Sequence, residues 1–371
     1  CSSRDLLTIF IGIELASTPM FLLSGWKKGD RKSNEGAIKF FLLGVLSASL
    51  ILYGFSLIYG LTGQLVFADI SAYLLANSLG SSPVLLLSAI LVISGIGFKI
   101  SVVPFHSWAP DTYEGAPLPI TAYLSVSSKA TGFVALIVLL TKVFESSGQS
   151  WGVILAIVAG ATMTLGNLVA LQQTNPVRLL AYSSISQAGF IIAPLAVSGI
   201  TGNYQDGIFA SVTYLIIYAF MNIGAFLSVH LFTNFTKSDN FYEWGGIAKH
   251  SPLAGVLTTV FFFSLAGIPP LGGWFAKFVV FRSLLSTGEI IGISLAIVGA
   301  INAVIALVYY ARISKVIWMD ELKNPEEEKS FEFQSPLKVV GALTVLITFV
   351  AGIFPGIFSY LGEVSSIFFG N

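Results

Sequence analysis

Charged residues are scarce in this chain of 371 residues: they make up 10% of it, whereas hydrophobic residues make up 55%. Soluble domains carry roughly 25% charged residues, so the chain has too little charge to cover a soluble fold. The single cysteine, Cys1, excludes an internal disulfide, an iron–sulfur cluster and a Cys-based zinc site. The three histidines show no paired-ligand spacing, and the net charge of zero gives no reason to expect a nucleic-acid partner, so we expect neither a bound metal nor nucleic acid.

The apolar residues occur in long runs that contain few or no charged residues. Seven blocks of 21 residues or more contain no charged residue: 40–61, 151–171, 179–200, 207–229, 251–276, 290–311 and 339–362. About 20 apolar residues cross a bilayer as a helix. Three further runs each contain one charge: 6–25, 83–108 and 117–141. Strands are excluded because barrel segments are short and alternate polar with apolar residues. The sequence therefore predicts an all-α polytopic membrane protein with about ten transmembrane helices.

Lysine and arginine indicate which way the helices run. Thirteen of the nineteen fall on the side of loop 26–39, and three, Arg4, Lys142 and Arg282, fall on the other side. Positive charge collects on the cytoplasmic side of membrane proteins, so we predict that loop 26–39 is cytoplasmic. The acidic, proline-broken loop 320–334 lies on the same side, and we interpret it as a solvated connector.

Four charged residues lie inside predicted spans: Glu14, Lys99, Lys129 and Lys277. Each costs about 2.5–3.5 kcal/mol at a helix centre, so such residues usually face a polar pathway or one another. Lysine suits proton transfer because burial favours its neutral form and a nearby carboxylate favours its charged form. Two structural alternatives stay open: Glu14 pairs with Lys99, or Lys277 snorkels to the membrane surface.

Two predicted helix breaks accompany these charges. Pro104 removes the amide that would bond the carbonyl of Ile100, and Pro269 with Pro270 frees the carbonyls of Leu265 and Ala266. Freed backbone groups in a membrane must be buried in protein or face water. Paired broken helices, five spans apart, indicate inverted repeats with a transport site between them.

Other polar residues allow two interpretations each. His106 either extends a proton relay or caps the broken helix, because histidine titrates near neutral pH. The polar residues of segment 175–190 either hold water or join helices by hydrogen bonds. Glu35 and Lys39, one helical turn apart, are expected to form a surface pair.

Four segments resemble the antiporter-like subunit N of respiratory complex I, a family related to Mrp-type cation/proton antiporters. They are FIGIELASTPMFLLSG, GFKISVVPFHSWAPDTYEGAPLPITAYLSVSSKA, NPVRLLAYSSISQAGF and SLAGIPPLGGWFAKF. The resemblance implies two inverted helical bundles, each with one broken helix. It also implies a proton pathway, with Glu14 as the family's glutamate, Lys99 as its partner, Lys129 as the central lysine and Lys277 as the outlet.

The resemblance further implies a division of the chain into three parts. Residues 1–145 would form the remainder of the first bundle, 146–320 the second bundle, and 321–371 the acidic loop and final helix. Family chains have several helices before the glutamate span, which are absent here. We therefore expect a fragment or a shortened variant.

The resemblance implies a proton-translocating subunit of a complex that oxidises NADH, ferredoxin or a reduced deazaflavin and reduces quinone. Flavin mononucleotide, iron–sulfur clusters and quinone are expected in partner subunits, and no cofactor in this chain. Expected partners are other membrane subunits, including neighbouring antiporter-like subunits, and lipids. We expect a bacterial inner membrane, or a thylakoid membrane. The alternatives are a stand-alone Na⁺(K⁺)/H⁺ antiporter and a non-pumping scaffold.

Overall fold

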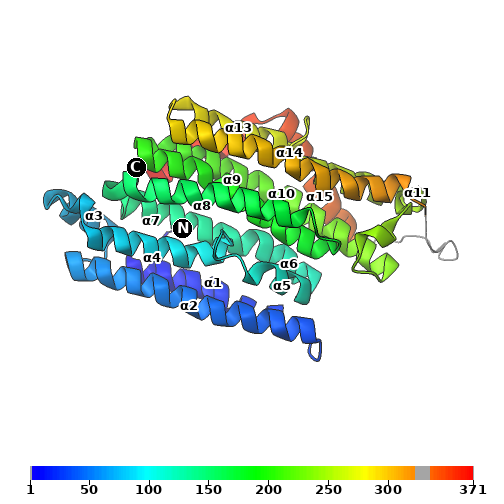
Figure 1. Cartoon of the computed structure of the whole chain (residues 1–371), viewed down its shortest axis with the longest axis horizontal. Coiled ribbons are helices and arrows are strands. Elements are labelled where there is room, and N and C mark those ends of the chain that lie inside the picture. The colour runs from blue at the N-terminus through cyan, green and yellow to red at the C-terminus, as the bar shows by residue number, and fades with distance from the viewer. Residues whose placement is uncertain (1, 322–334, 371) are drawn as a thin grey trace.

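The computed structural model describes residues 2–321 and 335–370 as a bundle of helices that run mostly along one axis (Figure 1). This part of the chain contains no strand, only an isolated bridge between Asp5 and Val66. The predicted all-α class is confirmed. Residues 322–334, which hold most of the predicted acidic loop, lie outside the described residues.

The α-helices follow one another in chain order. They are α1 (Leu6–Ser24), α2 (Arg31–Thr62), α3 (Phe67–Ala76), α4 (Pro83–Ile100), α5 (Trp108–Gly115), α6 (Leu118–Tyr123), α7 (Lys129–Lys142), α8 (Gly148–Ala170), α9 (Pro176–Thr201), α10 (Tyr204–Thr236), α11 (Ile247–His250), α12 (Pro252–Ala266), α13 (Gly272–Ser286), α14 (Ile290–Met319), α15 (Ser335–Ile353) and α16 (Gly356–Gly370). A π-helical segment, Leu124–Ser128, joins α6 to α7.

Within the described residues, nine helical segments are long and apolar enough to cross a membrane. Helices α12 and α13, of 15 residues each, lie on either side of a break and supply a tenth crossing. This agrees with the predicted number. The predicted final span, 339–362, is itself divided, because α15 ends at Ile353 and α16 begins at Gly356; both pack along α10.

Local sequence accounts for where several helices begin. Asp5, Asp30 and Asn175 each precede a helix, and their side chains accept hydrogen bonds from amides of its first turn. Asp and Asn are favoured at this position because the first amides of a helix have no partner within it. These caps fix the starts of α1, α2 and α9.

Helix α9 forms the centre of the bundle, and 94% of its most apolar stretch is buried. Its closest neighbour is α8, and the two backbones meet at small residues. A Cβ on Gly189 would lie 2.8 Å from the Met163 amide nitrogen, and one on Gly166 would lie 2.7 Å from that of Ser186. Glycine at these positions therefore permits an approach that any side chain would prevent.

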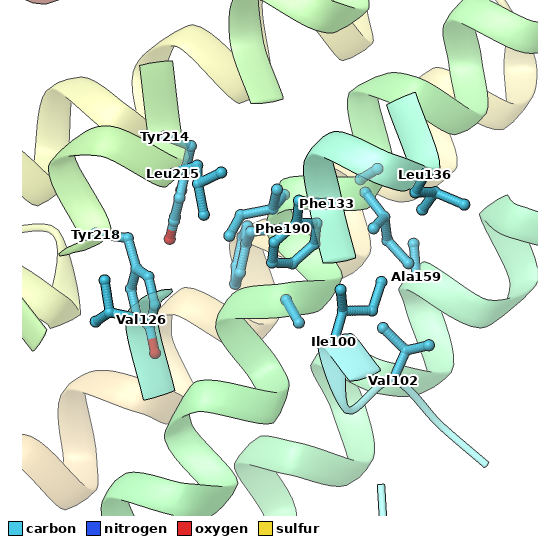
Figure 2. Close-up of a cluster of buried hydrophobic side chains, with 14 of the residues drawn as sticks. Ile100, Val102, Val126, Phe133, Leu136, Ala159, Phe190, Tyr214, Leu215 and Tyr218 are labelled. Atoms are coloured by element: carbon cyan, nitrogen blue, oxygen red, sulfur yellow. The ribbon is translucent and has the colours of Figure 1, made fainter. Parts of the chain in front are cut away.

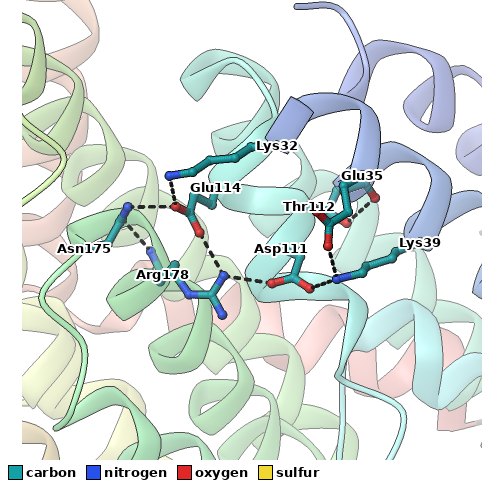
Figure 3. A network of polar contacts seen from close by, with 9 residues as sticks. Lys32, Glu35, Lys39, Asp111, Thr112, Glu114, Asn175 and Arg178 are labelled. Atoms are coloured by element: carbon teal, nitrogen blue, oxygen red, sulfur yellow. Dashed lines mark hydrogen bonds and ion pairs between the residues drawn. The ribbon is translucent and has the colours of Figure 1, made fainter. Parts of the chain in front are cut away.

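A charged network ties α2, α5 and α9 together at one end of the bundle (Figure 3). Arg178 bonds both Asp111 and Glu114 at 2.8 Å, Lys32 bonds Glu114 at 2.7 Å, and Lys39 bonds Asp111 at 2.6 Å. The predicted pair between Glu35 and Lys39 is present at 2.7 Å and forms the outer edge of this network. The network gathers basic residues that the sequence assigned to the cytoplasmic side.

Both carboxyl groups of α5, which lies outside the nine spans, hold their charge strongly. Burial tends to raise the pKa of Asp111, but hydrogen bonds from Lys39 and Arg178 outweigh it and lower the pKa below its usual range. The same balance, with Lys32 and Arg178 as donors, lowers the pKa of Glu114. At the acidic pH where carboxyl groups titrate, the folded chain therefore binds fewer protons at Asp111 and Glu114 than the unfolded chain does.

We expect the network's stabilising effect to be complete above about pH 5 and to be lost as the pH falls below about 4, through the lowered pKa values. Thermal unfolding in detergent, followed by tryptophan fluorescence between pH 6 and pH 3, measures this loss. The double variant Asp111→Asn/Glu114→Gln should unfold earlier at pH 6 and show a flatter dependence on acid. An equally steep dependence in both proteins would contradict this assignment.

Candidate functional site: lysines at two helix breaks

The first break separates α4 from α5. Helix α4 ends at Ile100, Ser101 takes a left-handed conformation with φ of +60°, and the Val102 amide bonds the Gly97 carbonyl at 2.9 Å. The helix therefore ends four residues before Pro104, earlier than a break caused by the proline alone. Trp108 Nε1 donates to the Phe98 carbonyl at 2.8 Å and satisfies one end of the broken helix.

The second break, between α12 and α13, has the same construction. Helix α12 ends at Ala266, Gly267 has φ of +97°, and the Ile268 amide bonds the Phe263 carbonyl at 3.0 Å. In both breaks a cis X–Pro peptide comes three residues after the left-handed residue and a tryptophan comes seven residues after it. The matching residues are Ser101, Pro104 and Trp108 in the first break and Gly267, Pro270 and Trp274 in the second.

Lys99 lies in the last turn of α4 and is only 6% exposed. Its Nζ donates to the Ile13 carbonyl at 3.0 Å and to the Ser17 hydroxyl, both on α1. Glu14 and Lys99 line the same narrow pocket, yet no ion pair joins them among the described residues. The expected proximity is present, but the direct pair is not, because Lys99 bonds neutral groups of α1.

Lys129 begins α7, directly after the π-helical segment, and is 1% exposed. Its Nζ donates to the carbonyl and to the hydroxyl of Ser184 on α9, at 3.1 and 2.9 Å. A Cβ on Gly132, three residues further along α7, would lie 3.3 Å from Cγ of Lys99. Lys99 of α4 therefore packs against α7 at Gly132, one turn from Lys129.

Lys277 lies in α13 and is 4% exposed. Its Nζ turns back across the break and donates to the carbonyls of Leu265 and Ala266, at 3.2 and 2.6 Å. It also lies 5.3 Å from the ring centre of Phe190, within range of a cation–π contact. The alternative that Lys277 snorkels is therefore wrong. The two carbonyls freed by Pro269 and Pro270 are the groups that hold it.

His106 lies within the first break. Its carbonyl accepts the Ala109 amide at 3.0 Å and so starts the turn into α5. Its ring Nδ1 is buried without a hydrogen-bond partner in the part of the chain that the structure describes. The backbone of His106 thus takes part in this turn, and a role for the ring in proton transfer stays a prediction.

Several buried polar residues of the site were missed by the sequence reasoning. Tyr214 and Tyr218 on α10 are fully or almost fully buried (Figure 2). The Tyr214 hydroxyl donates to Gln187 Oε1. Tyr310 on α14 bonds Ser183. Tyrosine within an apolar run carries little signal, because the hydropathy pattern treats it as another large side chain.

Buried lysines at two matching helix breaks define a membrane protein of the cation/proton-antiporter class. The family model described as "NADH:quinone oxidoreductase/Mrp antiporter, TM" matches residues 3–305. The chain belongs to this family.

Curated relatives of this chain are named as subunits of NAD(P)H- or NADH-quinone oxidoreductase. NAD(P)H-quinone oxidoreductase subunit 2 of Rippkaea orientalis is 40% identical over 95% of this chain and 68% of its own length. NADH-quinone oxidoreductase subunit N of Heliobacterium modesticaldum is 36% identical over 99% of this chain and 74% of its own length.

Solved structures share the fold. Respiratory complex I from Thermus thermophilus contains a chain with a TM-score of 0.77 and 28% identity, covering 97% of this chain and 75% of that one. The Mrp complex of Dietzia has a TM-score of 0.86 over 99% of this chain and 74% of that one, at 20% identity, and so shows the fold alone.

Gly267 allows a test of the second break. A Cβ there would meet Cδ of Lys277 at 2.8 Å, in addition to the strain of a side chain at positive φ. Gly288→Ala is the matched control, because Gly288 also has positive φ (+69°) and has open space around its Cα. Both variants carry a backbone cost of about 1–2 kcal/mol. We expect Gly267→Ala to lower the thermal unfolding midpoint further; equal midpoints would show that Lys277 does not occupy this space.

Proposed function

We propose that this chain is a proton-translocating membrane subunit of a quinone-reducing complex of the NADH-quinone oxidoreductase type. The names of its relatives and the fold it shares with a complex I chain support this assignment. Membrane subunits of this kind belong to assemblies whose redox chemistry takes place elsewhere. We therefore assign flavin mononucleotide, the iron–sulfur clusters and quinone to partner subunits, and none of them to this chain.

The observation that carries the proposal is the burial of three lysines without an acidic partner. Among the described residues, no carboxylate lies within 4.0 Å of the Nζ of Lys99, Lys129 or Lys277. Each ammonium instead bonds only carbonyl and hydroxyl groups. A buried charge with neutral partners is costly. Three such lysines inside one membrane bundle are therefore candidates for groups that exchange protons.

In the proposed pathway, protons pass between Lys99 and Lys129 and then reach Lys277, which releases them. Glu14 acts through the pocket that it shares with Lys99: its negative charge favours the protonated lysine, and its neutralisation favours release. Neutral groups must bridge the intervals between the lysines, and Ser184 is one of them. We assign His106 a relay role next to the first break.

The two-bundle division is part of the same proposal. We assign residues 1–145 to a first bundle with Lys99 at its break, and 146–320 to a second bundle with Lys277 at its break. The shared construction of the breaks supports this division. The partners we propose are neighbouring antiporter-like subunits in a bacterial inner membrane or a thylakoid membrane.

We expect Lys99→Met and Lys277→Met to lower proton translocation by roughly a hundredfold or more, the scale of losing a positioned acid–base group. The assay is quinone-linked acidification of vesicles that contain the complete complex, with electron transfer to an artificial acceptor as the measure of assembly. Lys315→Met, an exposed lysine of α14, is the control and should pump normally.

Undiminished pumping by fully assembled variants would overturn the pathway. If the triple variant of Lys99, Lys129 and Lys277 also pumped, the chain would be a scaffold. The isolated chain in vesicles provides a second check. Loss of a pH gradient on adding Na⁺ or K⁺ would contradict the proposal in favour of cation/proton antiport.

A further inference from the structure

The carbonyls at the end of α12 need partners from outside their own helix. In a continuous helix the amides of residues 269 and 270 would bond the carbonyls of Leu265 and Ala266, but both residues are proline. The Ala266 carbonyl accepts a hydrogen bond from Lys277 Nζ at 2.6 Å. The Leu265 carbonyl has two donors, Lys277 Nζ and Gln187 Nε2, each at 3.2 Å. A carbonyl oxygen has two lone pairs, so both donors bind at once.

Gln187 is held in the orientation that this contact requires. It lies on α9 with 2% of its surface exposed, and the Tyr214 hydroxyl of α10 donates to its Oε1. The amide oxygen is thereby occupied, and its nitrogen faces Leu265. Figure 2 shows Tyr214 and Tyr218 side by side on α10, with both hydroxyls turned the same way, beside Phe190 of α9. The amide is thus held between a side chain of α10 and the backbone of α12.

The first break places its lysine differently from the second. Lys99 stands two residues before Ser101, as Leu265 stands two residues before Gly267. Ser17 of α1 contacts Lys99, whereas Gln187 of α9 contacts the backbone of Leu265. The first break has a carboxylate, Glu14, in its pocket; the group beside the second break is a neutral amide. The two halves therefore differ in whether a negative charge acts on the lysine.

We propose that Gln187 is a positioning residue for Lys277, which keeps the Leu265 carbonyl in place whether or not the lysine carries its proton. A neutral amine binds acceptors less strongly than an ammonium does, so the break would lose its main partner each time a proton leaves. Gln187 continues to satisfy the carbonyl at that moment. Because it is uncharged, it does so without holding the proton on Lys277. This inference rests on the proposed role of Lys277 in proton translocation.

The helix that carries Gln187 also joins it to the other lysine. Ser184, which binds Lys129, lies three residues before Gln187, one turn away on α9. Ser184, the partner of Lys129, and Gln187 thus lie on adjacent turns of one buried helix.

Two variants of the complete complex in vesicles test the inference through the pH profile of proton translocation. Gln187→Glu places a carboxylate next to the carbonyl that Lys277 binds. A negative charge this close to a lysine favours its protonated form. The alkaline limb of the pH profile should therefore move to higher pH by about one unit or more. Gln187→Met keeps the size and removes the hydrogen bond. It should slow translocation roughly fivefold, the effect of about 1 kcal/mol, without the same shift.

The control is Gln205→Glu, which makes the same change at an exposed position of α10 and should leave the profile unchanged. Unaltered rates and profiles in both Gln187 variants would overturn the inference. Equal slowing in both, with no displacement of the profile, would also overturn it, because that result describes a merely structural residue. If Lys277→Met itself pumps normally, the pathway proposal fails instead, so the two failures are distinguishable.

Discussion

The hydrogen bonds from Lys277 to the carbonyls of Leu265 and Ala266 join two half-helices, α12 and α13, between which the helical hydrogen bonds of the backbone are interrupted. A membrane interior supplies no water to unpaired backbone groups, so a broken helix is stable only where protein fills that role. A cation is well suited to the carboxyl end of a helix, where the backbone dipole is negative. The architecture around Lys277 follows from this requirement: Gly267 leaves room for its stem, Phe190 faces its charge, and Gln187 shares its acceptor.

The first break meets the same requirement without a lysine across the gap. Trp108 satisfies the Phe98 carbonyl, and Lys99 points away to α1. The position that matches Lys277 in spacing from the left-handed residue is Asp111, which belongs to the charged network at the end of the bundle. Two breaks of equal backbone geometry therefore carry opposite charges at matching places. The two breaks are alike in how the chain bends and differ in what the bend holds.

Much of this fold could be predicted from the sequence, because length and hydropathy determine a membrane span almost alone. The freed carbonyls of Leu265 and Ala266 could also be predicted, since proline has no amide. The end of α4 at Ser101 could not, because serine at positive φ has no sequence signature comparable to that of glycine. The bonds from Arg178 to Asp111 and Glu114 span more than 60 residues of sequence, and no local pattern predicts which distant charges meet. The contact of Gln187 with Leu265 was missed for the same reason.

Helix α9 shows what burial does to the sequence of a membrane helix. It is the most buried of the nine spans, at 94%, and has the lowest mean hydropathy of them, 1.4. A helix that is surrounded by protein does not need an apolar surface toward lipid. Its composition can therefore include more polar residues, as in the core of a soluble protein. The span with the weakest hydropathy signal is therefore the one that carries Ser184 and Gln187, the residues next to Lys129 and Lys277. If spans were recognised by hydropathy alone with a stricter threshold, the most buried span of the molecule would be the first to be missed.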